Sequence, residues 1–131
     1  MDFELKNVSV YSKDLYWMLK AVYQLEKEFE NEKWVFLKPS DPQKVFDEVV
    51  FQLEHRLKEL VNRKSLSSCK QLLYKIDVSE SQIARASASE VDVQFFRVLA
   101  KLILSRCLQK VLIRNYFKSN EKESFYKRLE S

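Results

Sequence analysis

Cys69, Cys107 and His55 are the side chains that would carry thiol or imidazole chemistry in this sequence. A cysteine nucleophile with a histidine base needs an activated thiolate, which is usually found near a helix N-terminus, and Cys69 lies near the start of an expected helix. A structural zinc site needs several Cys and His ligands. A di-iron bundle needs Glu-x-x-His twice, whereas Gln52 stands at the required position before the single histidine. We therefore predict no metal site, and expect His55 to be a surface residue.

The sequence contains no glycine. A P-loop, a GxGxxG dinucleotide turn and a GxSxG nucleophile elbow each require glycine, so these enzyme classes are excluded. Acid–base catalysis needs a buried carboxylate with a raised pKa, and we find no carboxylate within the apolar seams. Asp77, directly after Ile76, comes closest, and we interpret it as a turn or cap residue. We accordingly predict no catalytic residue, no cofactor-binding residue and no cofactor.

Basic residues recur every four positions along the C-terminal part of the chain, at Arg106, Lys110, Arg114 and Lys118. On a helix they form a slowly drifting stripe, which could contact phosphates or an acidic partner. Long Lys and Arg stems also cover apolar surface while their charged ends stay in water, and we favour this structural interpretation. These four residues are nevertheless the candidate contacts to a polyanion or a partner.

Charge is distributed unevenly along the chain. Residues 1–60 hold twelve acids and nine bases, whereas residues 61–131 hold fourteen bases and seven acids. The basic half could attract a polyanion or an acidic partner. Alternatively, it could complement the acidic half within the fold or across a dimer.

The elements that must position these residues are helices. We expect them over residues 12–33, 42–64, 65–77, 79–86 and 90–118, with a short final helix after a cap at 120–123. Two of them show the 4-3 spacing of a packing seam. The seam residues are Leu15, Met18, Val22, Leu25 and Phe29 in the first helix, and Phe46, Val50, Leu53, Leu57 and Leu60 in the second. Glu26, Glu28, Glu30 and Glu32 predict a solvated acidic end to the first helix.

The segment 90–118 carries apolar residues all around a helical wheel, which is typical of a helix enclosed by other elements. We therefore predict an all-α fold: a single compact helical bundle of about five to six helices around a long, largely buried C-terminal helix, residues 90–118. Residues 1–131 are expected to form one domain, given their number. Residues 1–11 and 34–38 stay open between extended and helical structure.

No apolar run approaches the roughly 18 residues that a spanning helix needs. We also find no basic segment followed by an apolar one at the start, so a secretory signal is not expected. Both cysteines lie in apolar stretches and are expected as free thiols. The sequence therefore predicts a cytoplasmic protein with no membrane partner.

Two strings, Leu72-Leu73-Tyr74-Lys75-Ile76-Asp77-Val78 and Leu108-Gln109-Lys110-Val111-Leu112-Ile113-Arg114-Asn115-Tyr116-Phe117, resemble segments of small helical bacterial proteins that have no assigned function. The resemblance covers the C-terminal half and includes no catalytic motif, so it transfers no functional residue. It implies a bacterial, cytoplasmic setting.

Three functional hypotheses follow. The first is a non-enzymatic helical protein–protein interaction module, with a homodimer as one form of it, supported by the seams and by aromatic residues such as Tyr16 and Trp17. The second is a nucleic-acid-associated protein that uses the basic stripe. A helix-turn-helix over 79–102 fits it poorly, because Glu90 and Asp92 would face phosphate. The third is an enzyme of unfamiliar type, thiol-dependent through Cys69.

Overall fold

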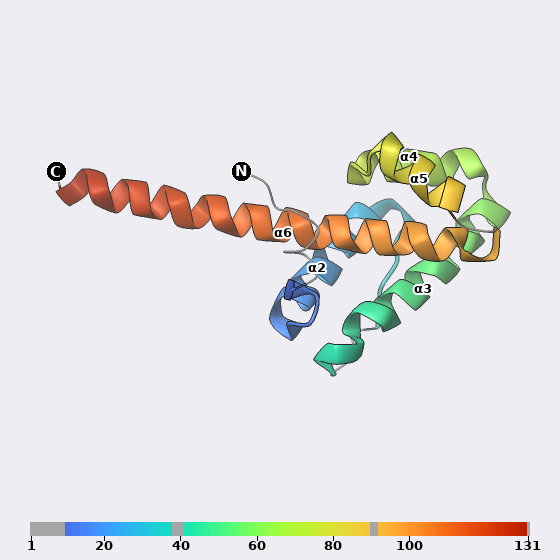
Figure 1. The fold of residues 1–131 in the computed structure, drawn as a ribbon, viewed down its shortest axis with the longest axis horizontal. Coiled ribbons are helices and arrows are strands. Elements are labelled where there is room, and N and C mark those ends of the chain that lie inside the picture. The colour runs from blue at the N-terminus through green and yellow to red at the C-terminus, as the bar shows by residue number, and fades with distance from the viewer. Residues whose placement is uncertain (1–9, 38–40, 90–91, 131) are drawn as a thin grey trace.

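The predicted all-α class is confirmed. The structure, a computed structural model, describes residues 10–37, 41–89 and 92–130, and within these ranges it holds helices and no strand (Figure 1). The elements are α2 (Leu15–Glu28), the 3-10 turn η1 (Glu30–Glu32), α3 (Pro42–Arg63), α4 (Leu66–Ile76), α5 (Glu80–Ser89) and α6 (Asp92–Glu130).

The first expected helix is shorter at both ends than the predicted 12–33. α2 begins after Asp14 rather than after Ser12, because the Asp14 carboxylate accepts hydrogen bonds from the backbone N–H groups of Tyr16 and Trp17 at 3.0 and 3.4 Å. At its other end the α-helix gives way to η1, and Lys33 then adopts a left-handed conformation with φ 54°. This conformation stops the helical path.

The next three helices begin where the sequence predicts. α3 starts at Pro42, and Ser65 caps α4 by accepting from the Ser68 N–H at 3.1 Å. Ser79 and Gln82 form a capping box at the start of α5, each side chain accepting from the other residue's backbone N–H. The predicted end of this helix at residue 86 is wrong, since α5 continues to Ser89. Alanine within this stretch favours helix, and serine tolerates it.

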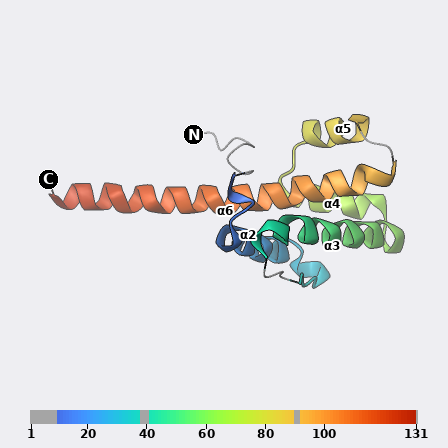
Figure 2. The same ribbon diagram turned by 60° about the horizontal axis from the view of Figure 1, so that its bottom comes forward.

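The last helix is longer than predicted. The expected break at 120–123 is wrong, because α6 runs unbroken from Asp92 to Glu130. No proline or glycine interrupts this range, and lysine and glutamate are good helix formers. In both ribbon views the final turns of α6 project beyond the other helices (Figures 1 and 2).

α6 is the hub of the bundle, in contact with α2, α3, α4 and α5. Its buried residues come in adjacent pairs four positions apart: Leu99 and Ala100, Ile103 and Leu104, Cys107 and Leu108, Val111 and Leu112. Between these pairs Lys101 is exposed and Leu102 is half-buried. The predicted burial therefore applies to one broad face over 99–112 rather than to the whole circumference.

Both predicted seams face this core. Met18, Val22, Leu25 and Phe29 are fully buried in the α2 region, as are Leu53, Leu57 and Leu60 in α3. Leu15 and Phe46, the first residue of each seam, are partly exposed and pack at the edge of the core. Each seam is thus covered over most of its length.

The segment 34–37 is neither helix nor strand, and its burial alternates. Trp34 and Phe36 are buried, while Val35 and Leu37 are exposed. The Gln52 side-chain amide accepts from the Leu37 N–H at 2.8 Å and donates to the Leu37 carbonyl at 2.9 Å. This pair of bonds fixes the segment against α3 and seats Trp34 on the Phe29 ring, 4.5 Å between centroids.

Candidate functional site

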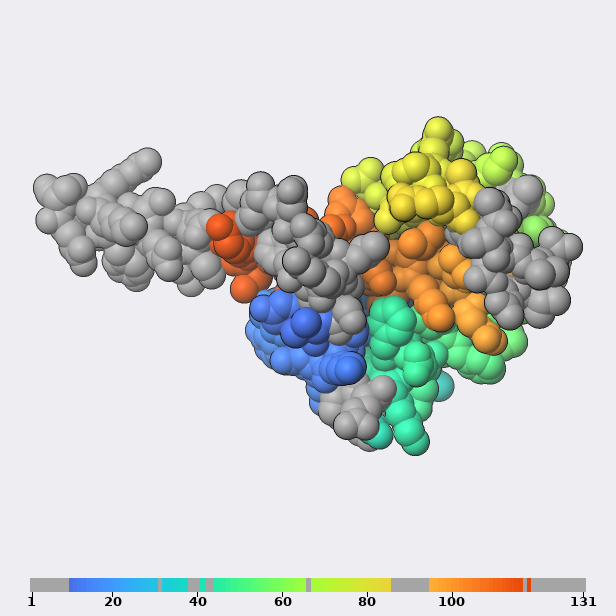
Figure 3. All heavy atoms as spheres, viewed as in Figure 1, coloured from blue at the N-terminus to red at the C-terminus, as the bar shows by residue number. Residues whose placement is uncertain are grey.

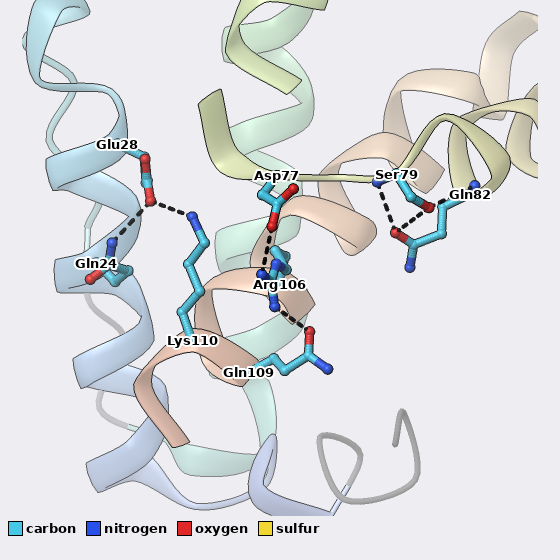
Figure 4. A network of polar contacts seen from close by, with 8 residues as sticks. All are labelled: Gln24, Glu28, Asp77, Ser79, Gln82, Arg106, Gln109 and Lys110. Atoms are coloured by element: carbon cyan, nitrogen blue, oxygen red, sulfur yellow. Dashed lines mark hydrogen bonds and ion pairs between the residues drawn. The ribbon is translucent and has the colours of Figure 1, made fainter. Parts of the chain in front are cut away.

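The four candidate basic residues do not share one environment. Arg106 donates to Asp77 at 2.9 Å and to Gln109 at 2.7 Å (Figure 4). Asp77 ends α4 in a left-handed conformation with φ 68°, which confirms its interpretation as a cap residue. Arg106 therefore joins α6 to the end of α4, and its charge is balanced within the fold.

Lys110 and Arg114 join α6 to α2. Lys110 Nζ lies 2.7 Å from Glu28 Oε1, and Arg114 donates to the side-chain amide oxygen of Gln24 at 3.2 Å. The Gln24 amide nitrogen in turn donates to Glu28 at 3.0 Å (Figure 4). The Lys110–Glu28 contact pairs a base from the basic half of the sequence with an acid from the acidic half. The two halves therefore meet here within one chain, one of the arrangements that the uneven charge distribution suggested.

Two glutamates of the acidic run are therefore not solvated. The Glu28 and Glu32 side chains are 11% and 12% exposed. Glu32 pairs at 3.0 Å with Arg63, the last residue of α3, and also with Lys64 directly after it. The sequence spacing is consistent with this burial, because Glu28 and Glu32 follow the buried Leu25 by three and seven residues and so lie on the same side of the helical path.

Glu54 corrects a second prediction, that no carboxylate lies within an apolar seam. Its side chain is 6% exposed and is paired at 3.3 Å with Lys58 and with Arg97 of α6. The i,i+4 spacing of Glu54 and Lys58 is typical of a helical ion pair, but it does not indicate that Glu54 is buried. Glu54 falls four residues after Val50 and three before Leu57, so it shares their face.

A surface groove lies between α2 and α6 beside these contacts. We call it the α2–α6 groove; it has a volume of about 480 Å³ and is lined by Tyr16, Trp17, Leu19, Lys20, Tyr23, Gln24, Val111, Arg114, Asn115 and Lys118. Its cations are Lys20, Arg114 and Lys118, and no carboxylate is among the lining residues. The last described side chains of α6, in red-orange in Figure 3, stand beside those of α2 in blue.

Two aromatic rings of the groove lie next to a lysine side chain. Lys20 Nζ lies 4.8 Å from the Tyr16 ring centroid and 5.8 Å from that of Trp17, and the two rings meet edge to face at 5.1 Å. Tyr16 and Tyr23 are nevertheless 59% and 61% exposed. The groove thus presents exposed aromatic rings and positive charge to an incoming molecule.

Sequence reasoning found this site in part. Arg114, Lys118, Tyr16 and Trp17 were singled out, but their meeting at one groove was not foreseen. Lys20 and Tyr23 were missed, although Tyr16, Lys20 and Tyr23 follow the 4-3 spacing of one helix face. The pattern lies on the side of α2 that faces away from the core.

The thiol and imidazole groups lie elsewhere. Cys69 and Cys107 are both buried, and burial raises the pKa of Cys69 above its usual value and that of Cys107 to about 12. These are the opposite of the shifts that activate a nucleophilic thiolate. His55 is exposed, as predicted, with its ring edge to face with Phe51 at 4.6 Å. Among the residues described, no three His, Cys, Asp or Glu side chains form a group that could hold a metal ion.

No helix in the described part of the chain combines the length and the apolar character needed to cross a membrane. In comparisons with protein-family models, curated proteins and solved structures, no match to this sequence was found.

Proposed function

We propose that the protein is a non-enzymatic interaction module that binds another protein through the α2–α6 groove. The observation that supports this most is the combination of the exposed Tyr16 and Tyr23 rings with a groove of about 480 Å³. Tyrosine and tryptophan are enriched in the centres of protein interfaces, because their rigid rings bury large areas at low entropic cost.

A single-stranded nucleic acid is the second candidate, since the same rings and cations would suit stacked bases and phosphates. The distribution of paired charges favours a protein partner over a nucleic acid. Arg106 and Lys110 are paired with Asp77 and Glu28, so the four-residue stripe does not offer a continuous line of cations to a phosphate backbone. With the three cations of the groove, the logarithm of affinity would fall by only about 2 per decade of salt.

Site-specific photo-crosslinking tests the proposal. A photoreactive phenylalanine analogue would replace Tyr23 in the groove. In a control variant it would replace Tyr74 on α4, which is outside the groove but equally exposed at 61%. In extracts of the protein's own cells, position 23 should give protein adducts that position 74 does not give and that survive nuclease treatment. Equal adducts at both positions, or adducts to nucleic acid at position 23, would contradict it.

A homodimer is a narrower form of the same proposal, in which the bound protein is a second copy. Size-exclusion chromatography with light scattering tests this form. A molar mass near twice the 15.7 kDa of one chain would support it, and a monomer at every concentration would contradict the dimer while leaving a different protein partner open.

A further inference from the structure

We propose that the α2–α6 groove binds an acidic amphipathic helix of a partner protein, and this rests on the proposed interaction function. The apolar side chains of that helix would lie against Trp17, Leu19 and Val111, and its carboxylates would meet the three groove cations. Three features of the groove lead to this partner: its charge, its helical walls and the charge of α6 beyond it.

The positive charge of the groove favours an acidic partner. Lys20, Arg114 and Lys118 line the groove, and Arg114 donates there to the neutral side-chain amide of Gln24 rather than to a carboxylate. Glu28, the carboxylate that takes part in this network, is already bonded to Lys110 and to Gln24. At Arg114, an incoming carboxylate therefore adds a favourable contact without displacing any ion pair found among the described residues.

The walls of the groove select a helix. Both are α-helices whose backbone groups are bonded internally, and the described residues contain no sheet edge to which an extended peptide could add a strand. A helix satisfies its own backbone groups, so it needs only side-chain contacts. α6 continues for twelve residues after Lys118, about 18 Å of helix, and would extend the track along which the bound helix lies (Figure 2).

Charge also disfavours α6 of a second copy as the occupant. Residues 113–130 contain five bases and three acids. The projecting part of a second α6 would therefore bring net positive charge to a groove that is already positive. The complementary partner is a different chain with a carboxylate-rich helix face.

Selection from a displayed library of amphipathic helical peptides of about 18 residues, roughly five turns, tests this inference with the full-length chain as bait. The library carries either Glu or Lys on its polar face and varied residues on its apolar face. We expect the selected peptides to be Glu-rich with aromatic or branched apolar anchors. Selection of Lys-rich peptides, or no charge preference among binders, would overturn the acidic assignment.

Two groove variants and two matched controls locate the binding. Tyr23→Ala should weaken the best selected peptide about tenfold or more, and Lys118→Glu about three- to tenfold, by fluorescence anisotropy. Phe51→Ala, at an aromatic residue that is 59% exposed on α3, and Lys75→Glu, at an exposed lysine on α4, should leave affinity unchanged. A Glu→Lys peptide should regain affinity for the Lys118→Glu protein. Failure of that charge swap would also overturn the acidic assignment.

The outcomes separate the inference from the proposed function. Peptides that need Tyr23 but carry no acidic face would leave the groove as a protein-binding site and overturn its assignment to an acidic helix. Binders that are indifferent to every groove variant, together with position-independent crosslinking, would overturn both. A single-stranded oligonucleotide that binds the groove and displaces the peptide would favour the nucleic-acid candidate instead.

Discussion

Lys110 and Glu28 form an ion pair that is largely shielded from solvent, with side chains 20% and 11% exposed. Replacing Lys110 by Met leaves Glu28 partly enclosed with Gln24 as its remaining partner in this network, which is costly for a charged group. We expect Lys110→Met to lower the free energy of unfolding by about 1–3 kcal/mol in urea denaturation.

The control for this prediction is the Arg56–Glu59 ion pair, in which the charged atoms are 3.6 Å apart. Its side chains are 43% and 64% exposed. Arg56→Met should change stability by less than about 0.5 kcal/mol, because water already screens that pair. Equal losses for the two variants would show that burial does not strengthen the Lys110 contact.

Cys107 makes stability depend on pH in the alkaline range. Burial raises its pKa from 9.0 to about 12, so between these values the unfolded chain loses the thiol proton and the folded chain keeps it. Its stabilising contribution is complete below pH 9 and is lost as pH rises towards 12. The slope is up to about 1.4 kcal/mol per pH unit.

Urea denaturation from about pH 8 to about pH 11, compared between the native chain and Cys107→Ala, measures this term, because the other titrating groups are common to both. The variant should be less stable at pH 8 through lost packing, but its stability should decline less steeply. Parallel curves would mean that Cys107 does not hold its proton in the folded state.

Among the individual residues, spacing predicted which apolar side chains are buried better than which charges are. The buried seams could be predicted because their apolar residues recur every three or four positions. Glu54 and Glu28 were missed because a carboxylate was assumed to be solvated, whereas each lies on a seam face and meets a cation from a helix far along the chain. Which distant cation meets a given carboxylate depends on how the helices cross, and no local pattern records that.

Among the connections between elements, Lys33 has an unfavourable backbone conformation. Its left-handed φ of 54° lets the chain leave η1, in a sequence that has no glycine for the purpose. We expect Lys33→Gly to raise the free energy of unfolding by about 0.5–1 kcal/mol, and Lys33→Val to lower it by about 1 kcal/mol or more.

Lys70 provides the comparison, since it is exposed within the regular helix α4. There the same change to glycine should destabilise by about 1 kcal/mol, as measured by thermal or urea unfolding. A loss of stability in Lys33→Gly would indicate that the Lys33 side chain contributes more than its backbone costs.

Helix starts were predictable where a side chain caps them, as at Ser65 and Ser79, or where proline stands at the first helical position, as at Pro42. Helix ends were less so. The expected breaks at 87–89 and 120–123 rested on serine and asparagine as turn or cap residues, and both are also tolerated within a helix. The α2–α6 groove could not be predicted as a unit, because Tyr16 and Lys118 are about a hundred positions apart and meet only through the packing of two helices.

For the whole molecule, the core residues of α6 end at Leu112, although the helix continues to Glu130. A chain that stops after Lys118 should therefore keep a cooperative thermal transition within a few degrees of the full-length value, followed by circular dichroism. A chain that stops after Ser105 loses four buried residues and should show no such transition: Cys107, Leu108, Val111 and Leu112. Loss of folding in the longer chain would assign the projecting turns a role in stability.

The position of α6 as both the hub and the last of these helices also governs how the chain is made. Gln24 and Arg114, which bond across the α2–α6 boundary, are 90 positions apart. At translation rates of about 5–20 residues per second, roughly 5 to 20 seconds separate their synthesis. Throughout that interval the apolar faces of α2 and α3 have no α6 to cover them, so the nascent chain should bind chaperones at these faces and release them once Leu112 has emerged from the ribosome.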